Sequence, residues 1–300
     1  MKVAILGASG IGKFHVREFN KAGTNVVAIL GSTKESAEKT ALSLSSSFGA
    51  IVKPYSNLKD LLDNEGPDAV SICTPPELHG EQVRILLEKG IHVFCEKPLV
   101  SGVNLFQRGK ELVELAKKNR KILCVNTQMP AMVEYIPKSF RKDIKFLEIQ
   151  MEPGKKDILE MLEDHLPHAN SLLIYLLGKG TMSNLELAPR VPEQFKCSFN
   201  YKTSKGDCNV VYDFKYKADR PRKIAIVING QEFDRVIGEN YTPFLVYSDK
   251  KVQMEDPFAV SISKFVQACN GTGNALVSGE DILENLRLGE TLIMKFKEVQ

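Results

Sequence analysis

The first 125 residues alternate short apolar runs with longer amphipathic segments. Apolar runs of this length, without polar alternation, are typical of strands buried on both faces of a parallel sheet. The predicted strands are 3–6, 26–30, 50–52, 69–73, 92–95 and 122–125, and the predicted helices between them are 13–21, 34–46, 58–63, 78–89 and 103–119. Repeated strand–helix units predict an α/β fold with a doubly wound parallel sheet of the Rossmann type.

Beyond this point the chain follows a period of two. Residues 195–202 alternate apolar and polar side chains, residues 208–217 do so in part, and Ile224, Ile226 and Ile228 continue the alternation. This pattern is typical of half-buried antiparallel strands. Helices are predicted at 257–269 and 279–297. We therefore expect a dinucleotide-binding domain over 1–124 and an α+β substrate domain over 125–300, with helices on one face of a mostly antiparallel sheet.

A glycine-rich turn follows the first predicted strand. It reads Gly7-Ala8-Ser9-Gly10-Ile11-Gly12, and a helix is expected from about Ile11. Glycines allow the backbone to approach a pyrophosphate, whose charge is met by free N–H groups at the helix start. Ser9 stands where the dinucleotide fingerprint has its second glycine, so Gly10 is expected to provide the close approach. The turn predicts a dinucleotide site.

The end of the second predicted strand bears on the choice of cofactor. NAD-binding folds place an acidic residue here to bind the ribose hydroxyls, whereas this chain has Gly31-Ser32-Thr33-Lys34. These positions carry no carboxylate to repel a 2′-phosphate, and two hydroxyls and an ammonium can bind one. We predict a preference for NADP, with NAD still accepted. Ser32 can equally cap the next helix, and both roles are compatible.

The fifth predicted strand ends in Glu96-Lys97-Pro98. In open α/β sheets, ligands bind outside the carboxyl ends of the strands. Pro98 has a fixed φ and disfavours a helical conformation at Lys97, which places the lysine stiffly at this edge. The alternative is a surface lysine at a strand end.

A second polar segment contains Asp164, His165, Pro167 and His168. Pro167 suits the first position of a helix, so Asp164 is expected in the preceding loop and His168 in the first turn, with Gly178 ending the helix. A helix N-terminus disfavours a cation, so His168 is expected to be neutral and able to act as a base. The alternatives are a capping carboxylate and a partly buried polar histidine. A metal site of His165 and His168 is disfavoured because Pro167 disturbs its geometry.

Composition narrows the class of protein. The chain has 300 residues, a net charge of +3 and 26% charged residues, as in soluble globular proteins. Its lysines are dispersed, which argues against nucleic acid, and no apolar run is long enough to span a membrane. The N-terminus lacks a signal-peptide pattern. Six cysteines have no metal spacing, and Cys73, Cys95 and Cys124 are expected in the core, which favours a reducing, cytoplasmic setting.

Four segments together resemble the Gfo/Idh/MocA family of NAD(P)-dependent oxidoreductases, which includes glucose-fructose oxidoreductase and inositol dehydrogenase. They are the glycine turn through His15, Thr74-Pro75-Pro76-Glu77-Leu78-His79, Glu96-Lys97-Pro98, and Ser278-Gly279-Glu280-Asp281. The resemblance implies that Lys97, Asp164 and His168 are catalytic. His168 would be the general acid/base on the substrate hydroxyl, Lys97 would stabilise charge on that oxygen, and Asp164 would orient the pair. Thr74, Pro75, His79, Glu96 and Lys97 would join the cofactor site.

Departures from the family pattern leave the substrate open. Ser171 stands where the family often has a further acid, the glycine run before Asp164 is absent, and residues 126–130 lack the frequent arginine. The leading hypothesis is an NADP-dependent oxidoreductase for a hydroxyl or carbonyl carbon of a small polar substrate, such as a sugar or polyol. The alternative is a non-enzymatic NADP-binding sensor or regulator.

Two other hypotheses concern a different enzyme class and self-association. Tyr55 with Lys59, and Tyr201 with Lys205, have the spacing of short-chain dehydrogenases. We reject this class because Tyr55 comes too early and Tyr201 lies on an alternating strand. A homo-oligomer through the second sheet is compatible with the polar face of residues 195–202, although that face suits solvent or a wet interface better than a dry one.

Overall fold

The computed structural model describes residues 1–299, which form two compact units. The first comprises Met1–Thr127 and Phe258–Leu283, and the second comprises Gln128–Pro257 and the chain from Glu284 onward. The contacts thus assign residues 258–283 to the first unit, whereas the sequence pattern suggests a single boundary near residue 124. Among the described residues, no helix combines the length and apolarity that a membrane crossing requires.

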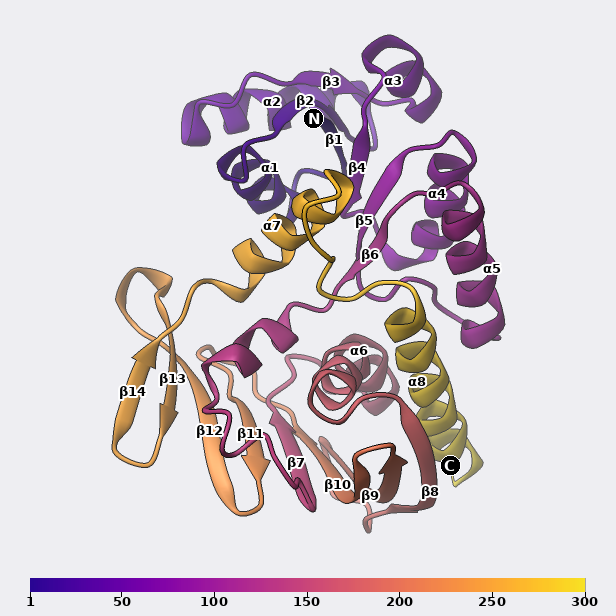
Figure 1. The fold of residues 1–300 in the computed structure, drawn as a ribbon. Helices are drawn as coiled ribbons and strands as arrows, with labels where there is room; N and C mark the ends of the chain where they lie inside the picture. Colours follow the sequence, from indigo (N-terminus) through magenta and orange to yellow (C-terminus); the bar gives the residue numbers. More distant parts are fainter. Residues whose placement is uncertain (300) are drawn as a thin grey trace. The chain divides into compact units, whose positions relative to one another are not determined.

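The first unit contains a six-stranded parallel sheet in the order β3-β2-β1-β4-β5-β6, as expected for a Rossmann fold (Figure 1). Its strands are β1 (Lys2–Leu6), β2 (Asn25–Leu30), β3 (Lys53–Tyr55), β4 (Ala69–Ile72), β5 (His92–Glu96) and β6 (Leu123–Asn126). The predicted third strand at 50–52 is wrong. Ala50 and Val52 are buried in the core, but it is the next three residues that pair with β2. Apolar character there reflects packing rather than strand pairing.

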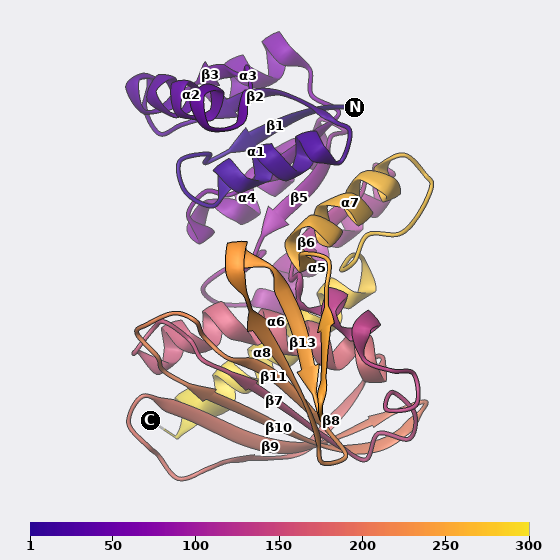
Figure 2. The same ribbon diagram turned by 90° about the vertical axis from the view of Figure 1, so that its left-hand side faces the viewer.

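The predicted helices of the first unit are present, with ends shifted by a few residues. They are α1 (Gly12–Lys21), α2 (Lys34–Phe48), α3 (Leu58–Glu65), α4 (Pro76–Glu88) and α5 (Leu105–Lys118). A further helix, α7 (Pro257–Cys269), lies beside α1, as Figure 2 shows. Phe265 of α7 packs against Phe19 and Phe94 with ring centroids 6.0 and 5.2 Å away. This aromatic contact explains why a distant segment belongs to the first unit.

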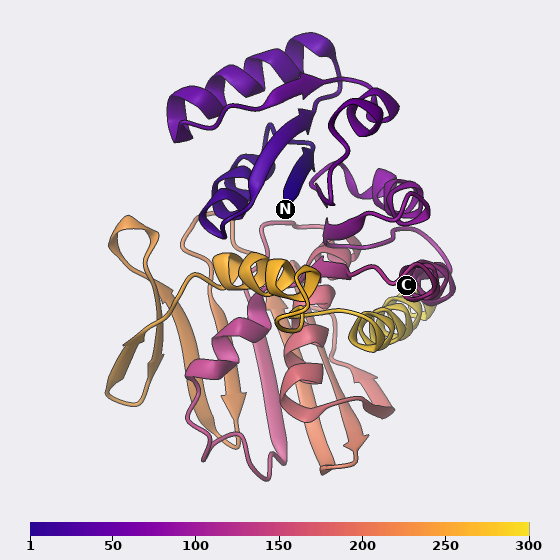
Figure 3. The same ribbon diagram turned by 45° about the horizontal axis from the view of Figure 1, so that its top comes forward.

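The second unit contains an eight-stranded sheet in the order β14-β13-β12-β11-β7-β10-β9-β8. Its strands are β7 (Phe146–Met151), β8 (Gly180–Leu187), β9 (Gln194–Thr203), β10 (Gly206–Lys215), β11 (Ile224–Ile228), β12 (Gln231–Ile237), β13 (Pro243–Tyr247) and β14 (Lys250–Gln253). Only the β7–β10 pair is parallel. Figure 3 shows β13 and β14 as a hairpin at one edge. The predicted mostly antiparallel sheet is confirmed.

Short 3₁₀ segments, η1 (Met129–Tyr135) and η2 (Glu239–Tyr241), connect these elements. The alternation predicted for β9 is also present. Phe195, Phe199 and Tyr201 are buried, whereas Lys196 and Lys202 are exposed on the opposite face. The helices α6 (Ile158–Leu177) and α8 (Glu280–Glu298) cover the apolar face (Figure 1).

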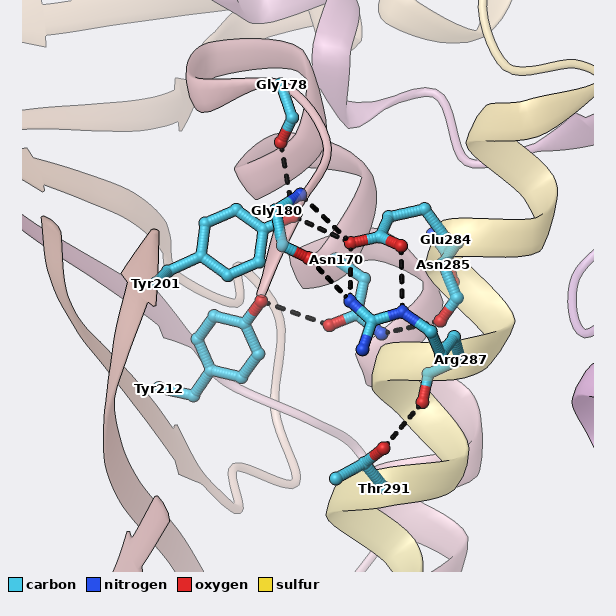
Figure 4. Close-up of polar contacts among 9 residues, drawn as sticks. All are labelled: Asn170, Gly178, Gly180, Tyr201, Tyr212, Glu284, Asn285, Arg287 and Thr291. Atoms are coloured by element: carbon cyan, nitrogen blue, oxygen red, sulfur yellow. Dashed lines mark hydrogen bonds and ion pairs between the residues drawn. The ribbon is translucent and has the colours of Figure 1, made fainter. Parts of the chain in front are cut away.

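Hydrogen bonds fix α6 against the sheet and α8 (Figure 4). The hydroxyl of Tyr212 donates to Oδ1 of Asn170 at 3.0 Å, and Nδ2 of Asn170 donates to the carbonyl of Asn285 at 3.0 Å. The hydroxyl of Tyr201 donates to Glu284 at 2.8 Å, and Glu284 also accepts from Arg287 at 2.7 Å. These buried polar groups are paired, so they specify how α6 lies on the sheet.

The predicted start of α6 is wrong. The helix begins at Ile158, where the side chain of Asp157 caps it by accepting from the N–H of Glu160 at 3.0 Å, and it continues through Pro167. An internal proline costs about 3 kcal/mol, but burial of the apolar side of α6 outweighs this cost. Asp164 and His168 therefore lie in the body of the helix, and His168 is too far from the helix N-terminus for the end of the helix dipole to affect it. Gly178 ends the helix as predicted.

Candidate active site

Gly7 and Gly12 are required by the packing of the turn after β1. Gly7 has φ +82°, and a Cβ placed on it would lie 2.6 Å from the carbonyl oxygen of Cys73. A Cβ on Gly12 would lie 2.5 Å from the carbonyl oxygen of Gly7. Both glycines therefore allow the chain to turn tightly against β4 before α1 begins.

Gly10 differs from these two glycines. A Cβ placed on it would meet no atom within 4 Å, and the neighbouring Ser9 and Ile11 are exposed. The backbone here is open just ahead of α1, whose N–H groups at Lys13 and Phe14 donate to the carbonyls of Gly10 and Ile11. An anionic group such as a pyrophosphate fits this position, because the turn offers donors and the positive end of a helix dipole.

The turn after β2 contains the predicted cofactor-selecting residues. Ser32, Thr33 and Lys34 are all exposed. The hydroxyl of Thr33 accepts from the N–H of Ser36 at 3.1 Å, so Thr33 caps α2, and the assignment of the cap to Ser32 is wrong. The ammonium of Lys34 is 3.9 Å from Glu38, and its side chain is 85% exposed. Ser32 and Lys34 are thus available to a ligand at this strand end.

His79 connects the turns after β4 and β5. It is buried, with Nδ1 2.7 Å from the carbonyl oxygen of Pro98 and Nε2 2.8 Å from that of Thr74. Both ring nitrogens face protein carbonyls, so His79 holds the two turns together rather than reaching outward. Thr74 and Pro75 lie in the first of these turns, and the hydroxyl of Thr74 donates to Gln82 at 2.6 Å.

Glu96, at the end of β5, is the centre of a buried polar cluster. Nε2 of His15 is 2.9 Å from Oε1 of Glu96, and Nδ1 of His15 is 2.8 Å from the hydroxyl of Ser71. The side-chain amide of Asn126 donates to the same Glu96 oxygen at 2.6 Å. Burial alone would raise the pKa of Glu96, but the hydrogen bonds from His15 and Asn126 and the charge of Lys97 keep this pKa below its usual value. Glu96 is therefore a carboxylate at neutral pH.

Lys97 follows this carboxylate directly, at the carboxyl end of β5, and is half-buried. The Lys97–Pro98 peptide bond is cis. A cation in this position, next to a fixed carboxylate at the ligand-binding edge of the sheet, can stabilise negative charge that develops on a substrate oxygen.

Asp164, His165 and His168 lie within two turns of α6. Oδ2 of Asp164 is 3.1 Å from Nδ1 of His165. The rings of His165 and His168 are 6.5 Å apart. From the sequence, His165 is considered only as a metal ligand, and its contact with Asp164 is not predicted. Among residues 1–299, no group of three or more His, Cys, Asp or Glu side chains is arranged to hold a metal ion.

The three predicted catalytic residues are divided between the two units. The first unit brings Lys97 together with Glu96, and through Glu96 with His15 and Asn126. The second unit brings Asp164 and His168 onto one helix together with His165.

The cysteines are not suited to nucleophilic chemistry. Cys95 and Cys124 are buried in the sheet, as predicted, whereas Cys73 is only half-buried. Burial raises the pKa of Cys95 well above its usual value and that of Cys124 to about 12. Since the thiolate is the reactive form, these thiols are inert at neutral pH.

A family model described as an oxidoreductase family with an NAD-binding Rossmann fold, GFO_IDH_MocA, matches residues 1–127. Residues 1–127 are thus similar to the Gfo/Idh/MocA oxidoreductases over the whole parallel sheet. The match covers β1 to β6 and includes the glycine turn and Glu96-Lys97-Pro98, which carried the resemblance in the sequence.

Two similar proteins are dehydrogenases by name. Inositol 2-dehydrogenase of Streptomyces avermitilis is 34% identical over 100 residues, which are 33% of this chain and 28% of that protein. The match thus spans less than a third of this relative. A 4-carboxy-2-hydroxymuconate-6-semialdehyde dehydrogenase of Sphingobium sp. is 24% identical over 301 residues, covering 90% of this chain and 86% of that protein.

A solved structure shows that the fold extends over both units. UDP-N-acetylglucosamine 3-dehydrogenase GnnA from Acidithiobacillus ferrooxidans superposes with a TM-score of 0.77 at 17% identity, covering 98% of this chain and 97% of that chain. At this identity the likeness concerns the fold alone.

Proposed function

We propose that this protein is an NADP-dependent oxidoreductase that transfers a hydride between a nicotinamide and a hydroxyl-bearing or carbonyl carbon of a small polar substrate. The observation that carries the proposal is the position of Lys97. It follows the hydrogen-bonded carboxylate of Glu96 at the carboxyl end of β5, in a Gfo/Idh/MocA dinucleotide-binding fold. A pure binding protein has no chemical need for a cation held at this point.

The cofactor would be held by the turn after β1 and the end of β2. The open backbone at Gly10, next to the positive end of the α1 dipole, suits its pyrophosphate. The exposed Ser32 and Lys34 suit a 2′-phosphate. When bound, the nicotinamide supplies the hydride acceptor or donor.

The chain's own residues would manage the proton and the charge on the substrate oxygen. His168 takes the hydroxyl proton onto its imidazole when the alcohol is oxidised and returns it in the reverse direction. The ammonium of Lys97 donates a hydrogen bond to the same oxygen and stabilises its developing negative charge. Asp164 acts as a positioning residue in α6, next to His165 at 3.1 Å.

The names of similar proteins support a dehydrogenase but differ in substrate. One is named for inositol and another for a carboxylated semialdehyde. Both substrates are small polar molecules with a hydroxyl or carbonyl carbon. We therefore infer a substrate of this general class.

The proposal is tested by assaying a panel of hydroxy and keto compounds with NADP(H) and NAD(H). We expect turnover of at least one compound and a higher kcat/KM with the phosphorylated cofactor. Equal kcat/KM for both cofactors would contradict the NADP preference. If no compound is turned over while NADP still binds, the protein is a binding protein and the enzymatic proposal is wrong.

A further inference from the structure

The second unit contains a cavity of about 520 Å³ that no proposed catalytic role explains. Its wall is formed by α6, the end of β7, the segment leading into β11, and β12 with the turn that follows it. Three arginines line it, Arg220, Arg222 and Arg235. His165 is the residue of α6 that lines it.

Arg235 occupies an otherwise apolar row of the sheet. Phe214 pairs with Met151, and Met151 pairs with Ile224 in the next strand. Ala225 pairs with Asp234, and β11 and β12 are antiparallel, so the next residue of β12, Arg235, lies beside Ile224 and continues the row. On its other side Arg235 pairs with Leu245. Because alternate residues share a face, Arg235 projects to the same side as the buried Phe233. This is the side covered by α6, since the ring of His165 lies 6.4 Å from that of Phe214.

A guanidinium in this row carries a desolvation cost. Nε of Arg235 is shielded from solvent and has no hydrogen-bond partner among residues 1–299. Burial lowers the pKa of Arg235, and the nearby charge of Arg220 acts in the same direction, while Asp256 and Asp234 oppose both. The arginine nonetheless stays charged at neutral pH. An anion that accepts hydrogen bonds from the fork of Arg235 would offset this cost.

The acid in the cavity wall does not neutralise these cations. Glu152 is 3.0 Å from the ammonium of Lys217 and accepts from the N–H of Lys223 at 2.7 Å. Arg222 is engaged with the loop, because its Nε donates to the carbonyl of Lys217 at 3.0 Å and its Nη2 to that of Ala218 at 2.9 Å. Arg235 and the exposed Arg220, which also line the cavity, are thus the candidate cations for a ligand.

We propose that this cavity binds the carboxylate or phosphate group of the substrate. The inference rests on the proposed function, because His165 joins the cavity to the catalytic segment. His165 lines the cavity, and its ring is 6.5 Å from that of His168. His165 therefore places the wall of the cavity within one helical turn of the proposed acid/base. The substrate is a hydroxy or keto compound that carries an oxyanion, rather than a neutral polyol.

The experiment is isothermal titration calorimetry of the full-length protein, saturated with NADP, with three probes. L-tartrate carries carboxylates, D-glucose 6-phosphate carries a phosphate, and myo-inositol is neutral. We expect at least one of the two anions to bind more tightly than myo-inositol. Tighter binding of L-tartrate would indicate a carboxylate ligand, and tighter binding of D-glucose 6-phosphate would indicate a phosphate ligand. Failure of both anions to bind at about 10 mM, where millimolar affinity is readily detected, would overturn the proposal.

Three variants locate the binding. Arg235→Gln should weaken anion binding by about 30-fold or more, as expected for loss of a desolvated charge partner. Arg220→Gln, on the exposed loop, should weaken it by about two- to five-fold without affecting folding. Arg190→Gln is the matched control, because Arg190 is an exposed arginine of the second unit outside the cavity. Equal affinity in wild type, Arg235→Gln and Arg220→Gln would overturn the proposal.

This test is separate from that of the oxidoreductase activity, because it measures binding without turnover. Loss of anion binding in Arg235→Gln, with full turnover retained in Lys97→Ala and His168→Ala, would uphold the anion site and contradict the proposed catalytic residues. The opposite result would uphold the catalytic residues and contradict the anion site.

Discussion

Nε2 of His15 lies 2.9 Å from Oε1 of Glu96, although the two residues are 81 positions apart in the chain. His15 is buried and Glu96 is half-buried, and their contact joins the first turn of α1 to the end of β5. It therefore links the helix that follows the glycine turn to the residue that precedes Lys97. This pair thus connects the proposed cofactor-binding turn after β1 with the proposed catalytic lysine at the end of β5.

The first prediction concerns the stability contributed by this pair. Glu96→Gln replaces an acceptor for both His15 and Asn126 with a neutral amide, so a buried hydrogen bond is lost or weakened. We expect the free energy of unfolding at neutral pH to fall by about 1–3 kcal/mol, measured by urea denaturation. Glu77→Gln, at an exposed position of α4, serves as the control and should leave it nearly unchanged. An unchanged stability in Glu96→Gln would contradict the assigned role.

The pH dependence of that difference is a second prediction. The pKa of Glu96 is lowered in the folded state, so its contribution is present above the unfolded pKa of about 4.3 and is lost as pH falls through the lower folded value. The stability gap between wild type and Glu96→Gln should therefore be full at neutral pH and shrink in acid. A gap that stays constant or widens as pH falls would refute the ionised, hydrogen-bonded carboxylate.

The glycines of the turn provide a matched pair of variants. Gly7→Ala forces a Cβ to within 2.6 Å of the Cys73 carbonyl oxygen at φ +82°, so we expect destabilisation of about 1–3 kcal/mol. Gly10→Ala meets no protein atom within 4 Å, so the fold should tolerate it. Gly10→Ala should instead raise the Kd for NADP, because the added methyl group narrows the approach of the pyrophosphate. Thermal denaturation and cofactor titration distinguish the two effects, and equal NADP affinity in wild type and Gly10→Ala would contradict the pyrophosphate position.

Pro167 lies between His165 and His168 inside α6. Pro167→Ala restores an N–H that can donate to the carbonyl four residues earlier, so the free energy of unfolding should rise by about 1–3 kcal/mol. The same change alters the local helix geometry between the two histidines, so kcat should fall. Urea denaturation and steady-state kinetics measure the two quantities. A decrease in stability would show that the proline is required by tertiary packing.

Helices and strands whose burial follows one regular pattern along their length could be predicted from the sequence. The buried parallel strands appear as apolar runs, and β9 appears as a strict alternation because one face packs on α6 and α8. The residues at which helices and strands begin and end were harder to predict from the sequence. The start of α6 was missed because Pro167 resembles a first helical residue, while the true cap, Asp157, lies earlier in a polar segment.

Relationships that depend on register or on distant segments could not be predicted at all. The pairing of His15 with Glu96 requires α1 to pack beside β5, and the place of α7 in the first unit depends on aromatic contacts with Phe19 and Phe94. Arg235 lies in β12, where no strand is predicted from the sequence. Its position in an apolar row follows only from the pairing of β11 with β12 and of β12 with β13.

The most direct test of the central claim is the single-turnover rate of hydride transfer, followed by nicotinamide absorbance, in wild type, Lys97→Ala and His168→Ala on a substrate identified from the panel. Lys118→Ala, an exposed lysine of α5, is the control. We predict that both active-site variants bind NADP almost as wild type does. Their hydride-transfer rates should fall by about 10²- to 10⁴-fold, whereas the rate of Lys118→Ala should not change. Wild-type hydride-transfer rates in both Lys97→Ala and His168→Ala would contradict the account.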